Sequence, residues 1–135
     1  MTDCIFCKII NKEVPADLVF EDPDTIAFLD IKPSSLGHTL VVSKEHVKTL
    51  DELPDAQAQS LMLTIKKLTK ALLKENQGCN IIQNNNSVAG QIVDHVHFHV
   101  VPRNEGDGLQ LNFGVHKEFS GEEKKNVIET IKKNI

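Results

Sequence analysis

The sequence predicts an α+β fold with a largely antiparallel sheet of about five strands, one long central helix and a C-terminal helix. Residues 95–101 alternate histidine with apolar side chains, which is the period of a half-buried strand. Residues 55–75 carry apolar side chains at the spacing of one helix face. Several short apolar runs lie between turn residues, and strands and helices mixed in this way are typical of α+β proteins.

The composition narrows the classes of function. A chain of 135 residues with 40% hydrophobic residues suits one domain with a substantial core. A net charge of −4 and an isoelectric point near 5.8 argue against a protein that holds a nucleic acid polymer on a broad basic surface, but not against a nucleotide in a local pocket. We find no run of about 20 apolar residues and no secretory signal, so we expect no membrane span and a cytoplasmic location.

The N-terminal third predicts a helix followed by a hairpin. Residues 4–11 have the apolar spacing of a short helix. Residues 18–21 and 25–29 are short strand candidates. The Asp-Pro-Asp sequence at 22–24 is a turn, so these two strands should pair with each other. A loop over residues 31–37 leads to the next strand.

The middle of the chain predicts a strand, a helix and another strand. Residues 39–43 form the third strand candidate. The helix over 55–75 has Asp55 as a candidate N-cap and Gly78 as a candidate C-terminal stop. Residues 80–83 supply the fourth strand.

The last part of the chain predicts one more strand and a final helix. A polar loop at 84–91 precedes the histidine strand, and Pro102 should end that strand. Residues 103–119 show little pattern. Ser120 and Glu123 match a capping box, which predicts a helix beginning there. The apolar face of this helix would consist of Val127, Ile128, Ile131 and Ile135.

The histidine strand is the strongest functional signal. Its side chains point to opposite faces in turn, so His95, His97 and His99 share one face while Val96, Phe98 and Val100 share the other. One histidine on a strand is usually an ordinary core or surface residue, but three in register suggest metal ligation or phosphoryl or acyl chemistry. The row spans roughly 13 Å at the usual strand rise. Because one ion cannot hold all three on a regular strand, we expect the histidines to divide these roles.

The Cys4-x-x-Cys7 sequence is a second, weaker signal. It is compatible with a redox pair, with half of a zinc site, or with chance. If it binds zinc, two further ligands must come from the histidines, among which His46 and His95 lie where they can reach a neighbouring element. Four protein ligands would make a structural site, whereas three ligands and a water would make a catalytic one. Cys79 is interpreted as a small core residue.

Phosphoryl chemistry is the other candidate for the histidine face. His97 lies in the middle of the strand, and a firmly held neutral histidine can attack phosphorus and form a covalent intermediate. Its other ring nitrogen then needs an acceptor, which the sequence does not reveal. Asp30 follows the second strand, where it either accepts hydrogen bonds from both ribose hydroxyls or merely caps the strand end. Donors available to a phosphate are His38, Asn84, Gln91 and His99.

Taken together, these motifs resemble a known family. Residues 95–101 match the H-φ-H-φ-H-φ-φ pattern of the histidine triad (HIT) superfamily, where φ is apolar. Residues 4–10, 27–31 and 37–46 resemble further blocks of the family, and 84–103 is the most similar stretch. The chain looks most like small bacterial-type HIT proteins of the Hint branch. The resemblance implies a HIT-like fold over residues 1–135, with core motifs at 4–103 and a C-terminal segment at 104–135.

The resemblance implies a role for each matching position. His97 matches the nucleophile that forms a nucleotidyl-histidine, and His38 and His99 match the histidines that contact the phosphate or orient the site. Asp30 matches the acceptor of ribose hydroxyls. Phosphate-side and ribose-side contacts match Asn84 and Gln91. Apolar walls around the base match Phe6, Ile10, Phe28 and Ile31. Zinc ligands match Cys4, Cys7, His46 and His95.

The implied activity is hydrolysis or transfer at the α-phosphate of purine nucleotide conjugates. Nucleoside phosphoramidates are the first substrate candidates and dinucleoside polyphosphates the next. The resemblance also implies one structural zinc per chain and a homodimer whose sheets join. Two positions depart from the family pattern: Asp94 replaces a residue that is often apolar or aromatic, and Ile92 replaces a serine that donates to the leaving group in some members.

Two other functions remain open. The protein could be a nucleotide-binding interaction or regulatory protein with incidental turnover. It could also be a zinc hydrolase in which metal-bound water attacks, although a fourth protein ligand would fill the position that such a water needs.

Overall fold

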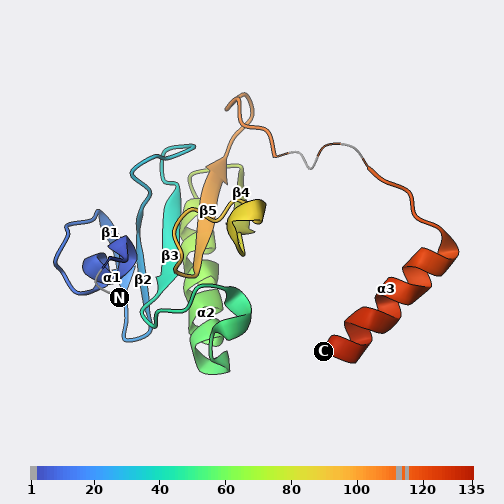
Figure 1. The fold of residues 1–135 in the computed structure, drawn as a ribbon. Coiled ribbons are helices and arrows are strands. Elements are labelled where there is room, and N and C mark those ends of the chain that lie inside the picture. Colours follow the sequence, from blue (N-terminus) through green and yellow to red (C-terminus); the bar gives the residue numbers. More distant parts are fainter. Residues whose placement is uncertain (1–2, 112–113, 115) are drawn as a thin grey trace.

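Five antiparallel strands form one sheet in the order β1-β2-β3-β5-β4 (Figure 1). The structure is a computed structural model that describes residues 3–111, 114 and 116–135. The strands are β1 (Leu18–Glu21), β2 (Thr25–Leu29), β3 (Thr39–Ser43), β4 (Gly78–Gln83) and β5 (His97–Arg103). The predicted α+β fold and the 18–21 and 25–29 hairpin are confirmed.

Two helices cover the two faces of the sheet. The described helices are α1 (Ile5–Ile10), α2 (Asp55–Leu72) and α3 (Gly121–Asn134), with 3-10 turns η1 (Leu50–Glu52) and η2 (Ser87–Ala89). The two that cover the sheet are α1 and α2. The long helix α2 packs through Leu61 and Ile65 against the core that contains Val41 and Phe98. The short helix α1 packs through Phe6 and Ile9 on the other side.

Alternation along the central strands places the histidines on the α1 side of the sheet. On β5, Phe98 belongs to the core under α2, as the strand pattern predicted. On the opposite face, His97 is in register with Val42 of β3, and Val42 packs in the core under α1. The histidine row therefore lies beside a short helix instead of beneath the long one.

Both predicted ends of the histidine strand were wrong. The histidine strand begins at His97, because the N–H groups of His95 and Val96 are used in a loop, where they donate to the carbonyls of Val93 and Val47. Pro102 does not end the strand. It lies beyond the last β5 residue that pairs with β3, where a missing N–H is tolerated.

The helix boundaries also differ. The central helix ends at Leu72 instead of residue 75, and Gly78 is the first residue of β4. Asp55 is the first helical residue, because Pro54 occupies the N-cap position. Proline requires no backbone donor, so it precedes a helix without loss.

The C-terminal helix α3 begins as predicted but stands apart from the sheet (Figure 1). The Ser120–Glu123 capping box is present in both directions. The apolar side chains of Val127, Ile128 and Ile131 are each about half exposed. None of the described helices is both long and apolar enough to cross a membrane.

Candidate functional site

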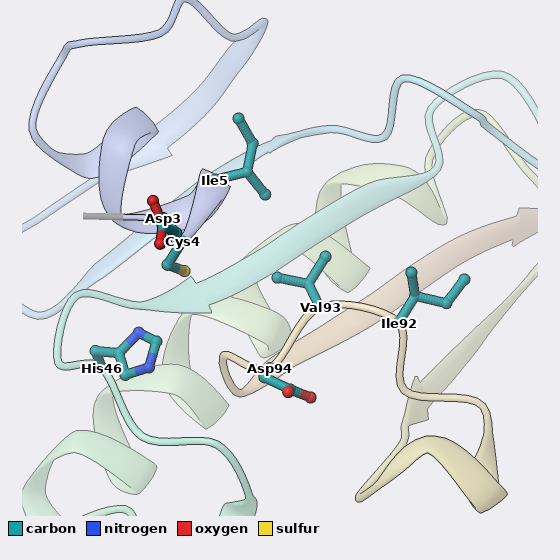
Figure 2. A pocket seen from close by; sticks show the side chains of 7 residues that line it. All are labelled: Asp3, Cys4, Ile5, His46, Ile92, Val93 and Asp94. Carbon is teal, nitrogen blue, oxygen red and sulfur yellow. The ribbon is translucent and has the colours of Figure 1, made fainter. Parts of the chain in front are cut away.

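A hollow of about 520 Å³ opens beside the N-terminus of α1 (Figure 2). Carboxylates and apolar side chains line it together with two residues that were predicted to bind zinc. Its lining consists of Asp3, Cys4, Ile5, His46, Ile92, Val93 and Asp94. Cys4 and His46 are therefore reachable from solvent. The two residues that depart from the pattern of the family that the sequence resembles, Ile92 and Asp94, both line this hollow.

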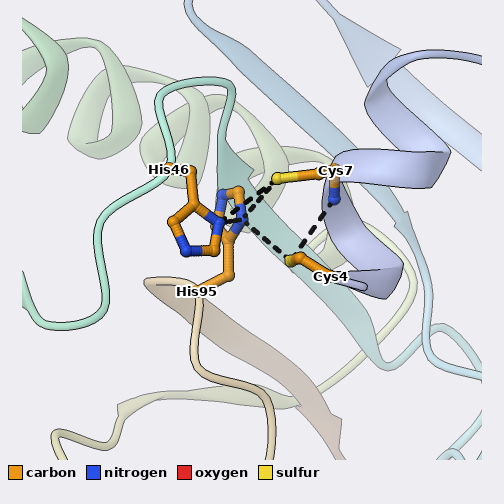
Figure 3. A group of neighbouring side chains, drawn as sticks. All are labelled: Cys4, Cys7, His46 and His95. Atoms are coloured by element: carbon orange, nitrogen blue, oxygen red, sulfur yellow. Dashed lines mark hydrogen bonds between the residues drawn. The ribbon is translucent and has the colours of Figure 1, made fainter. Parts of the chain in front are cut away.

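The four predicted zinc ligands meet at one point, and two of them, Cys4 and His46, also line the hollow (Figure 3). Their ligand atoms all lie within 4.8 Å of one another, and we call this group the thiol cluster: Cys4, Cys7, His46 and His95. Cys4 is the N-cap of α1 and Cys7 is inside the helix. His46 follows β3 and His95 precedes β5. Three separate segments of the chain thus converge on one point.

The distances within the thiol cluster fit a tetrahedral metal site. His95 Nδ1 lies 3.4 Å from Cys4 Sγ and 3.6 Å from Cys7 Sγ. His46 Nδ1 lies 3.2 Å from Cys7 Sγ and 3.0 Å from His95 Nδ1. Zinc bonds of about 2.3 Å to sulfur and about 2.0 Å to nitrogen place neighbouring ligand atoms roughly 3.3–3.8 Å apart. The two distances from His95 Nδ1 to the thiols lie within this range, and the two from His46 Nδ1 are slightly shorter.

The protonation of His95 also suits a metal. Its Nε2 lies 2.6 Å from the carbonyl oxygen of Ser43 and must donate to it, so the lone pair is on Nδ1, which faces the other ligands. Burial lowers the pKa of His95 to about 4, which keeps the ring neutral. Burial raises the pKa of Cys7, with Cys4 adding to the shift, and a divalent cation would allow both thiols to ionise. This donor set and the orientation of His95 fit zinc.

The imidazole of His97 is held in one tautomer. Its Nδ1 lies 2.7 Å from the carbonyl oxygen of His95, so Nδ1 carries the proton and Nε2 keeps its lone pair. The residue is 7% exposed, and burial lowers the pKa of His97. A neutral imidazole with one oriented lone pair is the form that acts as a nucleophile. The acceptor that the sequence could not identify is thus a main-chain carbonyl.

A second group lies at the other end of the histidine row, and we call it the carboxylate cluster: Asp30, His38 and His99. The N–H of Ser34 donates to His38 Nδ1 at 3.0 Å, so His38 carries its proton on Nε2. That proton is donated to His99 Nδ1 at 3.0 Å, with Asp30 Oδ2 at 3.5 Å from the same nitrogen. His99 therefore carries its own proton on Nε2.

Burial keeps the two imidazoles of the carboxylate cluster neutral. Burial is the largest cause that lowers the pKa of His99 to about 4, and the nearby rings of His97 and His38 lower it further. Burial also lowers the pKa of His38, although Asp30 opposes the shift. The ring centroids of His97 and His99 are 5.1 Å apart. The structure separates the row in space, since His95 belongs to one cluster and His99 to the other, with His97 between them. The division of roles among the three stays a prediction.

The polar loop before β5 is tightly built. Gly90 has a φ of +98°, and a Cβ there would lie 3.4 Å from Asn84 Nδ2, so glycine is favoured. The Gln91 carboxamide accepts from the N–H of Asn86 and donates to the carbonyls of Lys48 and Val93. For Gln91 to contact a phosphate, its carboxamide would have to give up one of these three hydrogen bonds. The roles of Asn84 and Gln91 remain predictions.

The predicted apolar wall is only partly assembled. The rings of Phe6 and Phe28 are buried and meet edge to face with centroids 5.6 Å apart. Ile10 is partly buried against the same core. Ile31 is 89% exposed and is not packed against them.

Sequence reasoning missed the main-chain groups that orient the histidines. The carbonyls of Ser43 and His95 and the N–H of Ser34 set the three tautomers, and no side-chain pattern reports them. It also missed that Phe6 contacts histidine rings. An aromatic residue between the two cysteines of the C-x-x-C was the available signal for that contact.

Comparisons with known proteins agree with this geometry. The family described as "HIT domain" matches residues 11–106, a range that begins after both cysteines of the thiol cluster. An adenosine 5'-monophosphoramidase of Schizosaccharomyces pombe is 45% identical over 111 residues, which cover 82% of each chain. A crystal structure of a HIT family member from Bacillus subtilis is 36% identical with a TM-score of 0.90, covering 98% of this chain and 97% of that one. A zinc-bound histidine triad protein from Mycobacterium smegmatis is 31% identical with a TM-score of 0.77, covering 99% of both chains.

Proposed function

This chain belongs to the HIT-domain family, and from that premise we propose that it is a nucleotide hydrolase or transferase acting through a covalent nucleotidyl-histidine on His97. The observation that carries the proposal is the 2.7 Å contact between His97 Nδ1 and the His95 carbonyl, which leaves the Nε2 lone pair available. The proposed substrates are purine nucleoside 5'-phosphoramidates, a class that the name of the yeast relative supports. Dinucleoside polyphosphates are the next candidates.

In the first step, His97 Nε2 attacks the α-phosphorus of the substrate. A bond forms between Nε2 and phosphorus while the bond from phosphorus to the leaving nitrogen breaks. The amine leaves with a proton taken from solvent, since Ile92 is 93% exposed and provides no hydroxyl. The His95 carbonyl keeps its hydrogen bond with Nδ1–H and stabilises the positive charge that develops on the imidazole.

In the second step, water attacks phosphorus and releases a proton to solvent, while the bond from phosphorus to Nε2 breaks. This releases a nucleoside monophosphate and restores neutral His97. His99 donates a hydrogen bond from Nε2–H to a phosphoryl oxygen in both steps and keeps its proton, because its Nδ1 already accepts from His38. Transfer to an acceptor other than water would follow the same second step.

The predicted nucleotide contacts are part of the same proposal. Asp30 Oδ1 accepts the N–H of Lys32, and its carboxylate still has lone pairs for two ribose hydroxyls. Asn84 and Gln91 are proposed for phosphate-side and ribose-side contacts. The residues proposed to contact the base are Phe6, Ile10, Phe28 and Ile31, of which Ile31 is not packed against the other three in this structure.

We assign one structural zinc per chain to the thiol cluster. It would be held by Cys4, Cys7, His46 and His95. A bound zinc would cross-link α1 to the loop that follows β3 and to the loop that precedes β5. The four ligands leave no position for an attacking water, which argues against the zinc-hydrolase alternative. Thiols bind metal when they are kept reduced, as in the cytoplasm, which we propose as the location.

A homodimer is part of the proposal. Among the described residues, strand β4 is at the edge of the sheet and pairs only with β5, so its outer edge can pair with a second copy. Ile81 on this strand is 47% exposed. The half-exposed apolar stripe of α3 offers further surface for the same partner.

One observation favours a second candidate, a nucleotide-binding regulatory protein with incidental turnover. Ile92 occupies the position at which some family members have a serine that donates to the leaving group, and its side chain has no hydroxyl. Weak acid assistance would lower the rate without weakening nucleotide binding.

The test compares AMP release from an adenosine phosphoramidate by the parent protein, His97→Ala and His116→Ala. His116 is exposed and belongs to neither cluster, so its variant controls for loss of a histidine. We expect His97→Ala to lose on the order of a thousandfold or more in kcat, and His116→Ala to match the parent. Nucleotide binding without turnover in the parent would favour the regulatory protein. Turnover by His97→Ala at the parent rate would contradict the proposed nucleophile.

A further inference from the structure

Phe6 lies between the thiol cluster and the nucleophile. Its side chain is buried, and its ring meets the rings of His95 and His97 edge to face with centroids 5.8 and 5.0 Å away. Along the chain, Phe6 lies between Cys4 and Cys7, the two thiols of the cluster. Its ring therefore touches one metal-ligating histidine and the nucleophile at once.

The position of Phe6 depends on how α1 is held. The helix has six residues, which is too short to be stable by itself. It is attached to the sheet by the buried side chains of Phe6 and Ile9 and by the thiol cluster. The cluster connects the first turn of α1 to His46 and His95, so a bound metal would fix the part of the helix that carries Phe6.

His95 provides a second connection from the cluster to the nucleophile. Its ring faces the thiols through Nδ1, while its main-chain carbonyl accepts from His97 Nδ1 at 2.7 Å. The residue is fully buried. Any shift of this ring would therefore also disturb the acceptor that orients His97.

We propose that Phe6 is a positioning residue that couples the metal site to the nucleophile. With metal bound, α1 is held so that the edge-to-face contact with the Phe6 ring limits rotation of the His97 imidazole, and Nε2 keeps its orientation. The turnover part of this inference rests on the proposed function, whereas the effect on the His97 ring does not. The zinc would thus influence the reaction without touching the substrate.

The experiment follows the His97 ring by ¹⁵N-edited NMR of histidine-labelled protein. The samples are zinc-loaded parent, chelator-treated parent, and zinc-loaded Phe6→Leu and Ile9→Val. Ile9 is on the same helix and in the same core but belongs to neither histidine cluster, so its variant controls for weakened packing. We expect a protected Nδ1–H signal in zinc-loaded parent and Ile9→Val, and exchange at least about tenfold faster after chelation or in Phe6→Leu.

Kinetics provide the second measurement. Phe6→Leu should lower kcat about tenfold or more, because the orientation of the nucleophile is relaxed, whereas Ile9→Val should keep the parent kcat. If chelation unfolds the protein, the zinc-loaded Phe6→Leu sample still tests the coupling. Unchanged Nδ1–H protection in Phe6→Leu would overturn the inference, even if His97 proves to be the nucleophile. Loss of protection without turnover by any sample would uphold the coupling and count against the proposed function.

Discussion

The thiol cluster and the carboxylate cluster each gather potential metal ligands within 4.8 Å, yet their imidazole protons lie in opposite places. In the thiol cluster, the carbonyl of Ser43 accepts a hydrogen bond from His95 Nε2–H, so the lone pair on Nδ1 faces the centre of the cluster. In the carboxylate cluster, the N–H of Ser34 donates to His38 Nδ1, so the proton on His38 Nε2 faces the centre of the cluster. Similar side chains therefore give an arrangement that fits a metal in one place and a proton-donating chain in the other.

The largest expected difference between the clusters is metal content. Cys4→Ala should lose nearly all bound zinc, and its free energy of unfolding should fall by several kcal/mol, because metal binding contributes directly to folding. Metal analysis of purified protein and urea unfolding measure both effects. Cys79→Ala is the matched control, since Cys79 packs against the core under α2 and belongs to neither cluster. Equal zinc in parent and Cys4→Ala would show that the site is misassigned.

The next effect concerns the carboxylate cluster. His38→Ala removes the donor to His99 Nδ1, so His99 no longer has a fixed tautomer, and kcat should fall roughly tenfold or more. Zinc content should stay at the parent level. Steady-state kinetics alongside metal analysis separate the two clusters. Loss of zinc from His38→Ala would contradict their separate roles.

The pH dependence of stability is a smaller effect. Because the pKa of His99 is about 4 in the folded protein and about 6.5 in an unfolded chain, the unfolded state binds more protons between these values. Stability should be fully present above pH 6.5 and decline as the pH falls toward 4, by up to about 1.4 kcal/mol per pH unit for this group. Urea unfolding of zinc-loaded protein should show a shallower decline for His99→Gln than for parent or His116→Gln. Parallel curves for all three would contradict the assigned role of burial.

The smallest effect is expected at the rim of the hollow. Asp94 and Lys48 form an exposed ion pair at 4.0 Å, and such pairs contribute little. Asp94→Asn should change the free energy of unfolding by less than about 0.5 kcal/mol and leave zinc content unchanged. A large loss of zinc in this variant would place Asp94 closer to the metal than the four-ligand account allows.

Much of this comparison was accessible from the sequence, because side-chain patterns encode it. The alternation through His97 and His99 placed them on one face of a strand, and the strand span required the histidines to divide their roles. The C-x-x-C spacing suggested half of a metal site. These inferences depend on residue types and periodicity, which the sequence displays directly.

The rest depends on main-chain geometry. Which ring nitrogen carries the proton is set by the carbonyls of Ser43 and His95 and by the N–H of Ser34, and every residue has such groups. The early start predicted for the histidine strand has the same cause, since the N–H of His95 is used by Val93 instead of a neighbouring strand. The exposure of Ile31 was equally inaccessible, because it depends on how the loop after β2 leaves the sheet.

The central claim is that His97 Nε2 forms a bond to phosphorus, and rapid mixing followed by intact-mass analysis tests it most directly. Zinc-loaded parent protein is mixed with an adenosine phosphoramidate, quenched with base to preserve the phosphorus–nitrogen bond, and compared with His97→Ala and His116→Ala. The account predicts a transient adduct heavier by one adenylyl group in the parent and in His116→Ala, located on His97 by fragmentation. Turnover without an adduct, or an adduct that persists in His97→Ala, would contradict it.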